Sequence, residues 1–242
     1  MADIRFVQAD TLKEKPADIS KVGFGRVFTD YMFEMDYNPE EGWHDARIVP
    51  YQDVPLSPAN ATLHYGQAIF EGCKAYRYEG GKAVVFRAKD HIARLNRSAK
   101  ILDIPEVDEK LVYDALMKLI DLEKDWIPDG PGQSLYIRPF IFSTDPYLGV
   151  SVGQYYKMMI ILSPVGAYYA NGFAPVKIMV EDTYVRAPKG GLGAAKTPAN
   201  YAASLHGGLI AHEKGYDQTL WTDGIEHKYI GEVGSMNILF KI

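Results

Sequence analysis

The chain has 242 residues, of which 47% are hydrophobic and 24% charged, and this composition indicates a globular protein with a sizeable core in one domain or two. Its formal net charge of −5 excludes the basic surface typical of proteins that bind nucleic acid or an anionic membrane. No stretch has the length of a membrane span and the first residues lack the pattern of a signal or transit peptide, so we expect a cytoplasmic protein.

The first part of the chain reads as a series of short strands after a polar lead-in. Alternating apolar residues and turn residues predict strands at Val22–Phe28 and Asp30–Tyr37, a turn at Asn38–Gly42, a buried element over Ala61–Gly72 and a hairpin of Cys73–Tyr78 with Lys82–Arg87. Cys73, the only cysteine, excludes an internal disulfide, and we interpret it as a small buried hydrophobe. The six histidines have no metal-ligand spacing, so we expect no metal site.

Helical patterns and the two clearest strands follow. Apolar residues at helical spacing predict a helix over 91–102, capped by Asp90, and another over 108–122. Residues 134–142 and 156–162 are typical strands, and on the first of them Tyr136 and Arg138 share one face. We expect a small N-terminal α+β domain over 1–170, a linker at 171–176 and a second domain from 177 that is incomplete at 242.

The second domain begins with a strand at 176–180 and contains a glycine-rich segment before a helix. Thr197 is a good N-cap and Pro198 suits the first helical position, while Tyr201, Leu205 and Leu209 predict an apolar stripe. Gly215 is expected to end this helix. A hairpin around 223–224 is predicted to follow.

Lys196 stands just before that helix, with only glycine, alanine and one leucine in the six positions before it. An isolated lysine in such a loop is most often a solvated side chain. A P-loop is a second alternative, but Ala195 replaces the glycine that this motif requires and no buried strand ends just before it. A third interpretation is a partly desolvated amine that attacks a carbonyl group, and pyridoxal phosphate is the cofactor that uses such a lysine.

Several motifs in a shared order distinguish these alternatives. They include Phe24-Gly-Arg-Val-Phe-Thr-Asp30, Phe70-Glu-Gly72, Arg94-x-x-Arg-Ser-Ala99, Leu135-Tyr-Ile-Arg-Pro139, Gly193-x-x-Lys-x-x-x-Asn-Tyr-Ala202 and Glu232-Val-Gly-Ser-Met-Asn237. Together they resemble the branched-chain amino acid aminotransferases, which are two-domain enzymes of fold type IV, with mixed α+β and α/β structure like that of D-amino acid aminotransferase. The resemblance covers nearly the whole chain.

The resemblance implies a role for each matching residue. Lys196 would carry pyridoxal phosphate and act as the catalytic base and acid, and the cofactor would further contact Arg94, Arg186, Tyr201, Glu232 and Ser235. Within this set Arg94 would bind the phosphate, Tyr201 the phenolic oxygen and Glu232 the pyridine nitrogen. The amino acid and 2-oxo acid substrates would contact Phe24, Tyr65, Tyr136, Arg138 and Tyr168.

The resemblance also implies a reaction and an assembly. The amino group of L-leucine, L-isoleucine or L-valine would pass to 2-oxoglutarate. Tyr65 would reach the site of a neighbouring subunit, so we expect a homodimer. Other fold type IV enzymes, namely D-amino acid aminotransferase or aminodeoxychorismate lyase, share the lysine and the glutamate and stay possible. Members of the family continue beyond the position of Ile242, so an inactive truncated form that acts only by interaction is a further alternative.

Overall fold

The computed structural model describes residues 4–166 and 174–241, which divide into two compact units, 1–172 and 173–242. The predicted linker at 171–176 lies partly outside the described residues. Within those residues, no helix combines the length and the apolar character that crossing a membrane requires. Each unit is described by itself.

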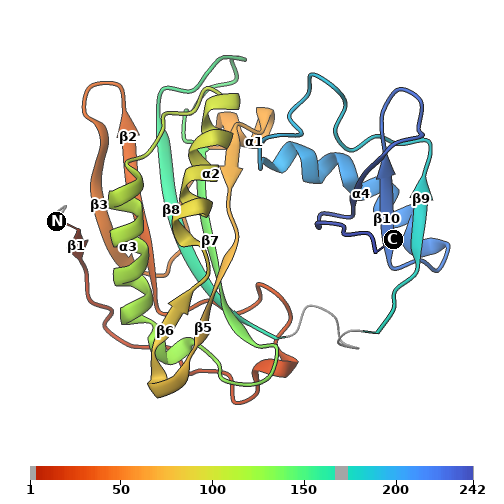
Figure 1. Cartoon of the computed structure of the whole chain (residues 1–242). Coiled ribbons are helices and arrows are strands. Elements are labelled where there is room, and N and C mark those ends of the chain that lie inside the picture. The colour runs from red at the N-terminus through yellow and green to blue at the C-terminus, as the bar shows by residue number, and fades with distance from the viewer. Residues whose placement is uncertain (1–3, 167–173, 242) are drawn as a thin grey trace. The chain divides into compact units, whose positions relative to one another are not determined.

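Unit 1 is an eight-stranded sheet covered by helices (Figure 1). Its strands are β1 (Arg5–Phe6), β2 (Tyr31–Asn38), β3 (Gly42–Pro50), β4 (Ala68–Phe70), β5 (Cys73–Arg77), β6 (Ala83–Val85), β7 (Ser134–Ser143) and β8 (Tyr156–Val165). Its α-helices are α1 (Ala61–Tyr65), α2 (Ala88–Ile101) and α3 (Glu109–Leu122), and single 3-10 turns lie at Ile19–Lys21, Glu79–Gly81 and Lys124–Trp126.

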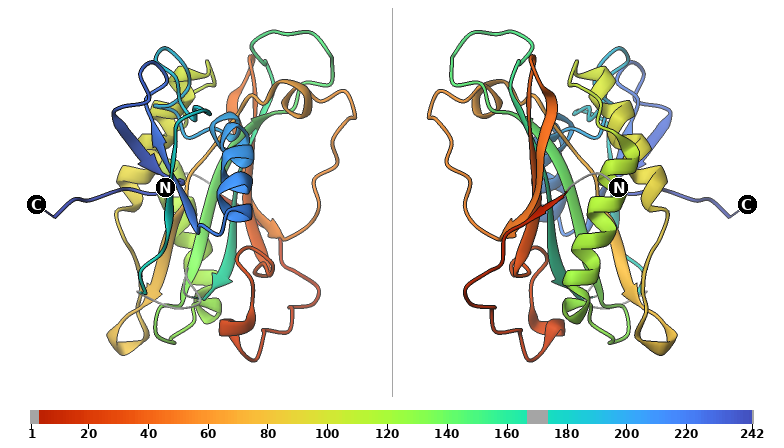
Figure 2. Two further views of the ribbon diagram at one scale, coloured as in Figure 1. Left: turned by 90° about the vertical axis from the view of Figure 1, so that its right-hand side faces the viewer. Right: turned by 90° about the vertical axis from the view of Figure 1, so that its left-hand side faces the viewer.

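The sheet of unit 1 has the strand order β1-β3-β2-β8-β7-β5-β6, and β4 pairs with β7 beside this path. All pairs are antiparallel except β1 with β3. Helices α2 and α3 cover one face, as the two side views in Figure 2 show. The main core fills the space beneath them, because alternate strand residues such as Phe33, Met35 and Ile137 point to that face.

The opposite face of this sheet carries a smaller apolar cluster. Met32, Phe142 and Met159 belong to it, and Tyr51 and Val54 from the segment after β3 pack against them. A sheet with apolar residues on both faces needs cover on both, and here the segment after β3 covers part of the second face.

Cys73 is buried at the start of β5. Burial is the main cause that raises the pKa of its thiol to about 12, so the thiol stays protonated at neutral pH. This confirms its interpretation as a small buried hydrophobe.

Unit 2 is a three-stranded sheet with one helix. Its elements are β9 (Ile178–Glu181), α4 (Pro198–Glu213), β10 (Gln218–Thr222) and β11 (Ile230–Val233). Strands β9 and β10 are parallel with α4 as their crossover, and β11 pairs with β10 in the antiparallel direction. Helix α4 begins at Pro198 with Thr197 as the N-cap residue, and Gly215 follows its end with φ +80°, as predicted.

The structure corrects three sequence expectations. Residues 22–28 form no strand, because Gly25 has φ +66° and the backbone turns there. Helix α2 begins earlier than predicted, at Ala88, and Arg87 rather than Asp90 is its N-cap residue. Leu205 and Leu209 of α4 are 72% and 54% exposed in this chain, because the helix packs on β10 through residues with smaller side chains.

Candidate active site

The loop that carries Lys196 connects β9 to α4. It therefore follows the carboxyl end of a strand whose parallel neighbour is β10, and such ends are where α/β folds bind ligands. Asn200, buried in the first turn of α4, holds the loop in place. Its side-chain amide donates hydrogen bonds to the carbonyl oxygens of Leu192 and Ala195, at 2.9 and 2.7 Å. The backbone just before the lysine is thus fixed to the start of the helix.

Lys196 and Tyr201 form a direct pair. The lysine Nζ donates a hydrogen bond of 2.6 Å to the tyrosine hydroxyl oxygen and lies 5.1 Å from the centre of the ring. Both side chains are partly buried. A carbonyl compound that reacts with Nζ would therefore have a phenol within hydrogen-bonding distance of the reacting group.

Two further predicted cofactor residues of unit 2 contact each other. Arg186 lies in the β9–α4 loop and donates from Nη2 to Oε2 of Glu232. Glu232 lies on β11 opposite Trp221, close to the carboxyl end of β10. Both side chains are largely buried, with 14% and 31% exposed, so this charge pair is shielded from water. Ser235 is exposed in the turn that follows β11.

Three predicted substrate residues of unit 1 come together. The ring of Phe24 meets the ring of Tyr136 edge-on at 4.9 Å, and Arg138 Nη2 donates a 3.0 Å hydrogen bond to the Tyr136 hydroxyl. This confirms that Tyr136 and Arg138 share one face of β7. The Arg138 guanidinium also lies over the ring of Phe70, 4.5 Å from its centre.

Arg138 has one buried nitrogen, Nε, without a hydrogen-bond partner among the described residues. Buried polar atoms are almost always paired in native proteins, so this atom suits a ligand with hydrogen-bond acceptors. Gly72 contributes to the same site, because a Cβ there would lie 2.1 Å from the Tyr136 hydroxyl. The arrangement places a cation and a phenol beside two phenylalanine rings, which suits an apolar molecule with a carboxylate.

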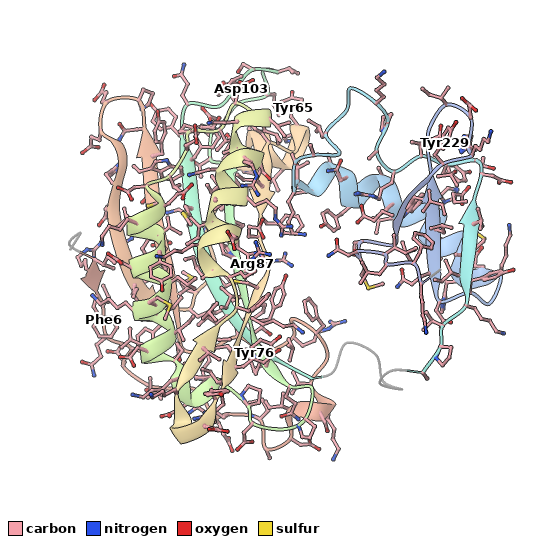
Figure 3. All side chains as sticks on the ribbon, viewed as in Figure 1. Phe6, Tyr65, Tyr76, Arg87, Asp103 and Tyr229 are labelled. Carbon is pink, nitrogen blue, oxygen red and sulfur yellow. The ribbon has the colours of Figure 1, made fainter. Side chains whose placement is uncertain are left out.

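Arg94 lines a separate pocket of about 230 Å³ in unit 1, at the start of α2. Its other lining residues are Phe86, Arg87, Asp90, His91 and Arg97. Cationic side chains outnumber the single acid in this pocket, which therefore favours an anionic ligand. Figure 3 labels Arg87, which is the N-cap residue of α2.

Two predicted site residues remain, Tyr65 and Tyr168. Tyr65, also labelled in Figure 3, is the last residue of α1 and is 43% exposed. Its hydroxyl donates to the carbonyl oxygen of Leu148 in the loop between β7 and β8. Tyr168 lies outside the described residues.

The sequence analysis assigned no role to several residues at these sites, among them Phe70, Gly72, His91 and Glu71, whose buried carboxylate contacts Arg94. The signal for Glu71 was present, since an acid inside the apolar run 68–73 must have a partner if it is buried. The signal for Phe70 and Gly72 was absent, because only the pairing of β4 and β5 with β7 places them beside Tyr136 and Arg138.

Comparisons with known proteins identify the family of the chain. Residues 68–242 match the family model described as amino-transferase class IV. Branched-chain-amino-acid aminotransferase 2 of Bacillus subtilis is 54% identical over 239 residues, which are 99% of this chain and 66% of that protein. The corresponding aminotransferase of Mycobacterium tuberculosis is 45% identical over 98% of this chain and 65% of its own length. The chain thus spans slightly less than two thirds of these curated relatives.

Solved structures support the same relationship. The branched-chain amino acid aminotransferase of Escherichia coli superimposes with a TM-score of 0.68 at 31% identity, over 84% of this chain and 62% of that chain. The T.th. enzyme, a branched-chain amino acid aminotransferase solved with pyridoxamine 5'-phosphate, gives a TM-score of 0.64 at 25% identity over 82% of this chain and 62% of its own. Both have the fold type IV architecture expected from the sequence. The chain belongs to the class IV aminotransferase family.

Proposed function

We propose that this chain transfers the amino group of L-leucine, L-isoleucine or L-valine to 2-oxoglutarate, with pyridoxal 5'-phosphate held on Lys196. The observation that carries the proposal is the 2.6 Å hydrogen bond between Lys196 Nζ and the Tyr201 hydroxyl, at the carboxyl end of β9. The names of the relatives and of the solved structures support the substrate class, and pyridoxamine 5'-phosphate in one of those structures supports the cofactor.

The residues present fit this cofactor. Lys196 supplies an amine for its aldehyde, and Tyr201 supplies a hydroxyl for its phenolic oxygen. Glu232 supplies a carboxylate for its pyridine nitrogen, and Arg186, which contacts Glu232, holds that carboxylate in place. Arg94, in a pocket rich in cations, would bind the phosphate, and Ser235 would contribute its hydroxyl to the same cofactor.

When bound, pyridoxal phosphate accepts the electrons that remain on Cα of the amino acid after the Cα proton leaves. Lys196 Nζ, freed when the amino group of the substrate replaces it on the cofactor, would take this proton as general base and later return a proton as general acid. The hydrogen bond to Tyr201 orients Nζ for both transfers. A base held in position acts faster than a free one, because its orientation requires no further loss of entropy.

The cluster on β7 supports an amino acid with an apolar side chain. Arg138 and Tyr136 bind the substrate carboxylate, since the guanidinium and the phenol point to the same place and Arg138 Nε needs an acceptor. Phe24 contacts the branched side chain. We propose that Tyr168 lines this site too, and that Tyr65 contributes to the site of a second subunit in a homodimer.

The proposal is tested by comparing three substrates on this chain: L-leucine with 2-oxoglutarate, D-alanine with 2-oxoglutarate, and aminodeoxychorismate. We expect transamination of L-leucine at a rate at least ten times that of either alternative, because the β7 cluster presents aromatic rings to the side chain. Turnover of D-alanine or aminodeoxychorismate in preference to L-leucine would assign the chain to another activity of the family. A chain that folds but turns over none of the three substrates would contradict the proposal.

A further inference from the structure

Glu71 is a fully buried carboxylate without a role in the proposed chemistry. It lies between β4 and β5, its side chain is 1% exposed, and its backbone N–H donates a 2.7 Å hydrogen bond to the carbonyl oxygen of Pro139 on β7. The segment is therefore fixed to an interior strand of the sheet. An ionised carboxylate at such a place is costly unless positive groups contact it.

Three donors contact this carboxylate. Arg94 donates from Nε to Oε1 at 2.5 Å and from Nη2 to Oε2 at 2.7 Å, so the two side chains form a bidentate pair. His91 Nδ1 lies 2.9 Å from Oε2, and the N–H of Gly72 donates to the same oxygen at 3.2 Å. Burial acts to raise the pKa of Glu71, but the hydrogen bonds from Arg94 and His91 outweigh burial and hold this pKa below its usual value.

The bidentate pair fixes the plane and the direction of the Arg94 guanidinium. Two parallel hydrogen bonds along one edge of the fork leave it little freedom to rotate. Arg94 nevertheless keeps 45% of its side chain exposed, and it lines the 230 Å³ pocket at the start of α2. Glu71 thus holds the buried edge of a guanidinium that faces an open pocket.

The remaining charges of the pocket do not take over this role. Arg87 is paired with Asp90 at 2.6 Å, and both are more than 60% exposed, so that pair is weak and solvated. Arg97 is exposed on the same helix. Among the arginines that line this pocket, Arg94 is therefore the one that a buried carboxylate orients.

Stability alone gives a weak reason for a buried ion pair at this position. Desolvation of both charges cancels most of their attraction, and apolar residues of similar volume often stabilise a fold as well or better. The stronger reason is that the pair fixes the orientation of the Arg94 guanidinium. We propose that Glu71 is a positioning residue that holds Arg94 to bind the phosphate group of the cofactor, an inference that rests on the proposed function.

The test compares the affinity of the chain for pyridoxal 5'-phosphate with its affinity for pyridoxal, which lacks the phosphate. In Glu71→Gln the amide nitrogen cannot accept from Arg94, so one bond of the pair is lost together with the charge. We expect about a tenfold loss of affinity for pyridoxal 5'-phosphate, in the range seen when a partner of a binding group is removed. The affinity for pyridoxal should stay unchanged.

A double-mutant cycle separates positioning from a general effect on the fold. If Glu71 acts through Arg94, Glu71→Gln should have no further effect on the phosphate preference once Arg94→Ala is present. Glu71→Asp keeps the charge on a side chain shorter by one methylene and should retain part of the preference, which also covers the case in which Glu71→Gln does not fold. Equal losses for both ligands, or additive effects in the cycle, would overturn the inference.

A matched control comes from the other end of the same sheet. Glu34 on β2 is a buried glutamate paired with Arg47 at 2.7 Å, so Glu34→Gln removes the same charge from a similar pair. We expect this variant to be destabilised without any change in phosphate preference. Glu34→Gln could also lose as much preference for pyridoxal 5'-phosphate over pyridoxal as Glu71→Gln. That result would mean that Glu71 has only a structural role.

Inorganic phosphate distinguishes a failure of this inference from a failure of the proposed function. A chain that binds no pyridoxal 5'-phosphate on Lys196 would contradict the proposed function. Titration with inorganic phosphate, followed by NMR of the Arg94 side chain, still tests Glu71. Binding to the wild-type chain that weakens in Glu71→Gln supports the positioning role, and binding that is absent or equal in both overturns it.

Discussion

Arg138 is the side chain whose surroundings say most about the substrate. Its guanidinium is held between the Phe70 ring and the Tyr136 hydroxyl, and its buried Nε has no partner among the described residues. A carboxylate that binds there would accept from a planar fork whose position is already fixed. Recognition of the carboxylate end of any amino acid would thus depend on this residue more than on the side-chain pocket.

We therefore expect Arg138→Lys to raise the KM for L-leucine by about tenfold, because lysine keeps the charge but loses the bidentate fork. Steady-state kinetics measure this change. Arg77→Lys is the control, since Arg77 donates to backbone carbonyl oxygens of Lys124 and Ile127 instead. An unchanged KM in Arg138→Lys would show that the carboxylate binds elsewhere.

At the level of single residues, the sequence predicted a shared position where the alternation of a strand sets it. Tyr136 and Arg138 share a face because strand side chains alternate, whereas the direct contact of Lys196 with Tyr201 was not predicted. The partner of Arg94 could not be predicted, because Glu71 is distant in the sequence and only the sheet brings them together. Buried charge pairs of this kind depend on tertiary structure.

Among the elements, α4 shows how a helix adapts to the strand beneath it. Gly207 faces the ring of Trp221, and a Cβ at this position would lie 2.6 Å from that ring. Neighbouring Gly208 has nothing within 4 Å of the same position. The helix can therefore approach β10 closely because Gly207 has no side chain.

This pair of glycines gives a matched test. We expect Gly207→Ala to destabilise unit 2 by about 1–3 kcal/mol through overpacking against Trp221. Gly208→Ala should stabilise it by about 0.5–1 kcal/mol, because alanine favours the helix. Hydrogen exchange of the α4 and β10 amides in the two variants measures both effects. Equal protection in the two variants would mean that α4 does not pack on β10 in this way.

Element boundaries were predictable where a local signal set them. Asp108 caps α3 through its side chain, and Asn38 and Gly42 bound the turn between β2 and β3, as their residue types indicate. The strand expected at 22–28 does not form, because alternating apolar residues alone do not supply hydrogen bonds to a neighbouring strand. The apolar stripe predicted for α4 is not the face that packs, because small residues at 207 and 211, rather than the leucines, contact the sheet.

For the whole molecule, one buried carboxyl group that is not among the candidate site residues makes stability depend on pH. Glu123, at the end of α3, is 2% exposed and accepts a hydrogen bond of 2.5 Å from the backbone N–H of Tyr31. Burial is the main cause that raises its pKa from 4.5 to about 7, and nearby Asp30 acts in the same direction. The folded chain therefore binds this proton more tightly than the unfolded chain does.

The sign of the resulting pH dependence follows from linkage. Between pH 4.5 and about 7 the folded state holds the proton that the unfolded state has lost, so the free energy of unfolding falls as pH rises through this window. Glu123→Gln should remove this slope and stabilise the chain at pH 8 by about 1–3 kcal/mol. Denaturant unfolding at pH 5 and pH 8 measures the change. Glu40→Gln, in the exposed β2–β3 turn, is the control, and a slope retained in Glu123→Gln would contradict the assignment.

In the proposed function Lys196 carries the cofactor, and chemical trapping tests this claim. The chain is incubated with pyridoxal 5'-phosphate, reduced with borohydride and digested, and the modified peptide is identified by mass spectrometry. We predict a visible absorption band that reduction abolishes, and a single label on the peptide that contains Lys196. A label on Lys189 of the same loop, labels spread over surface lysines, or no label on a folded chain would contradict the claim.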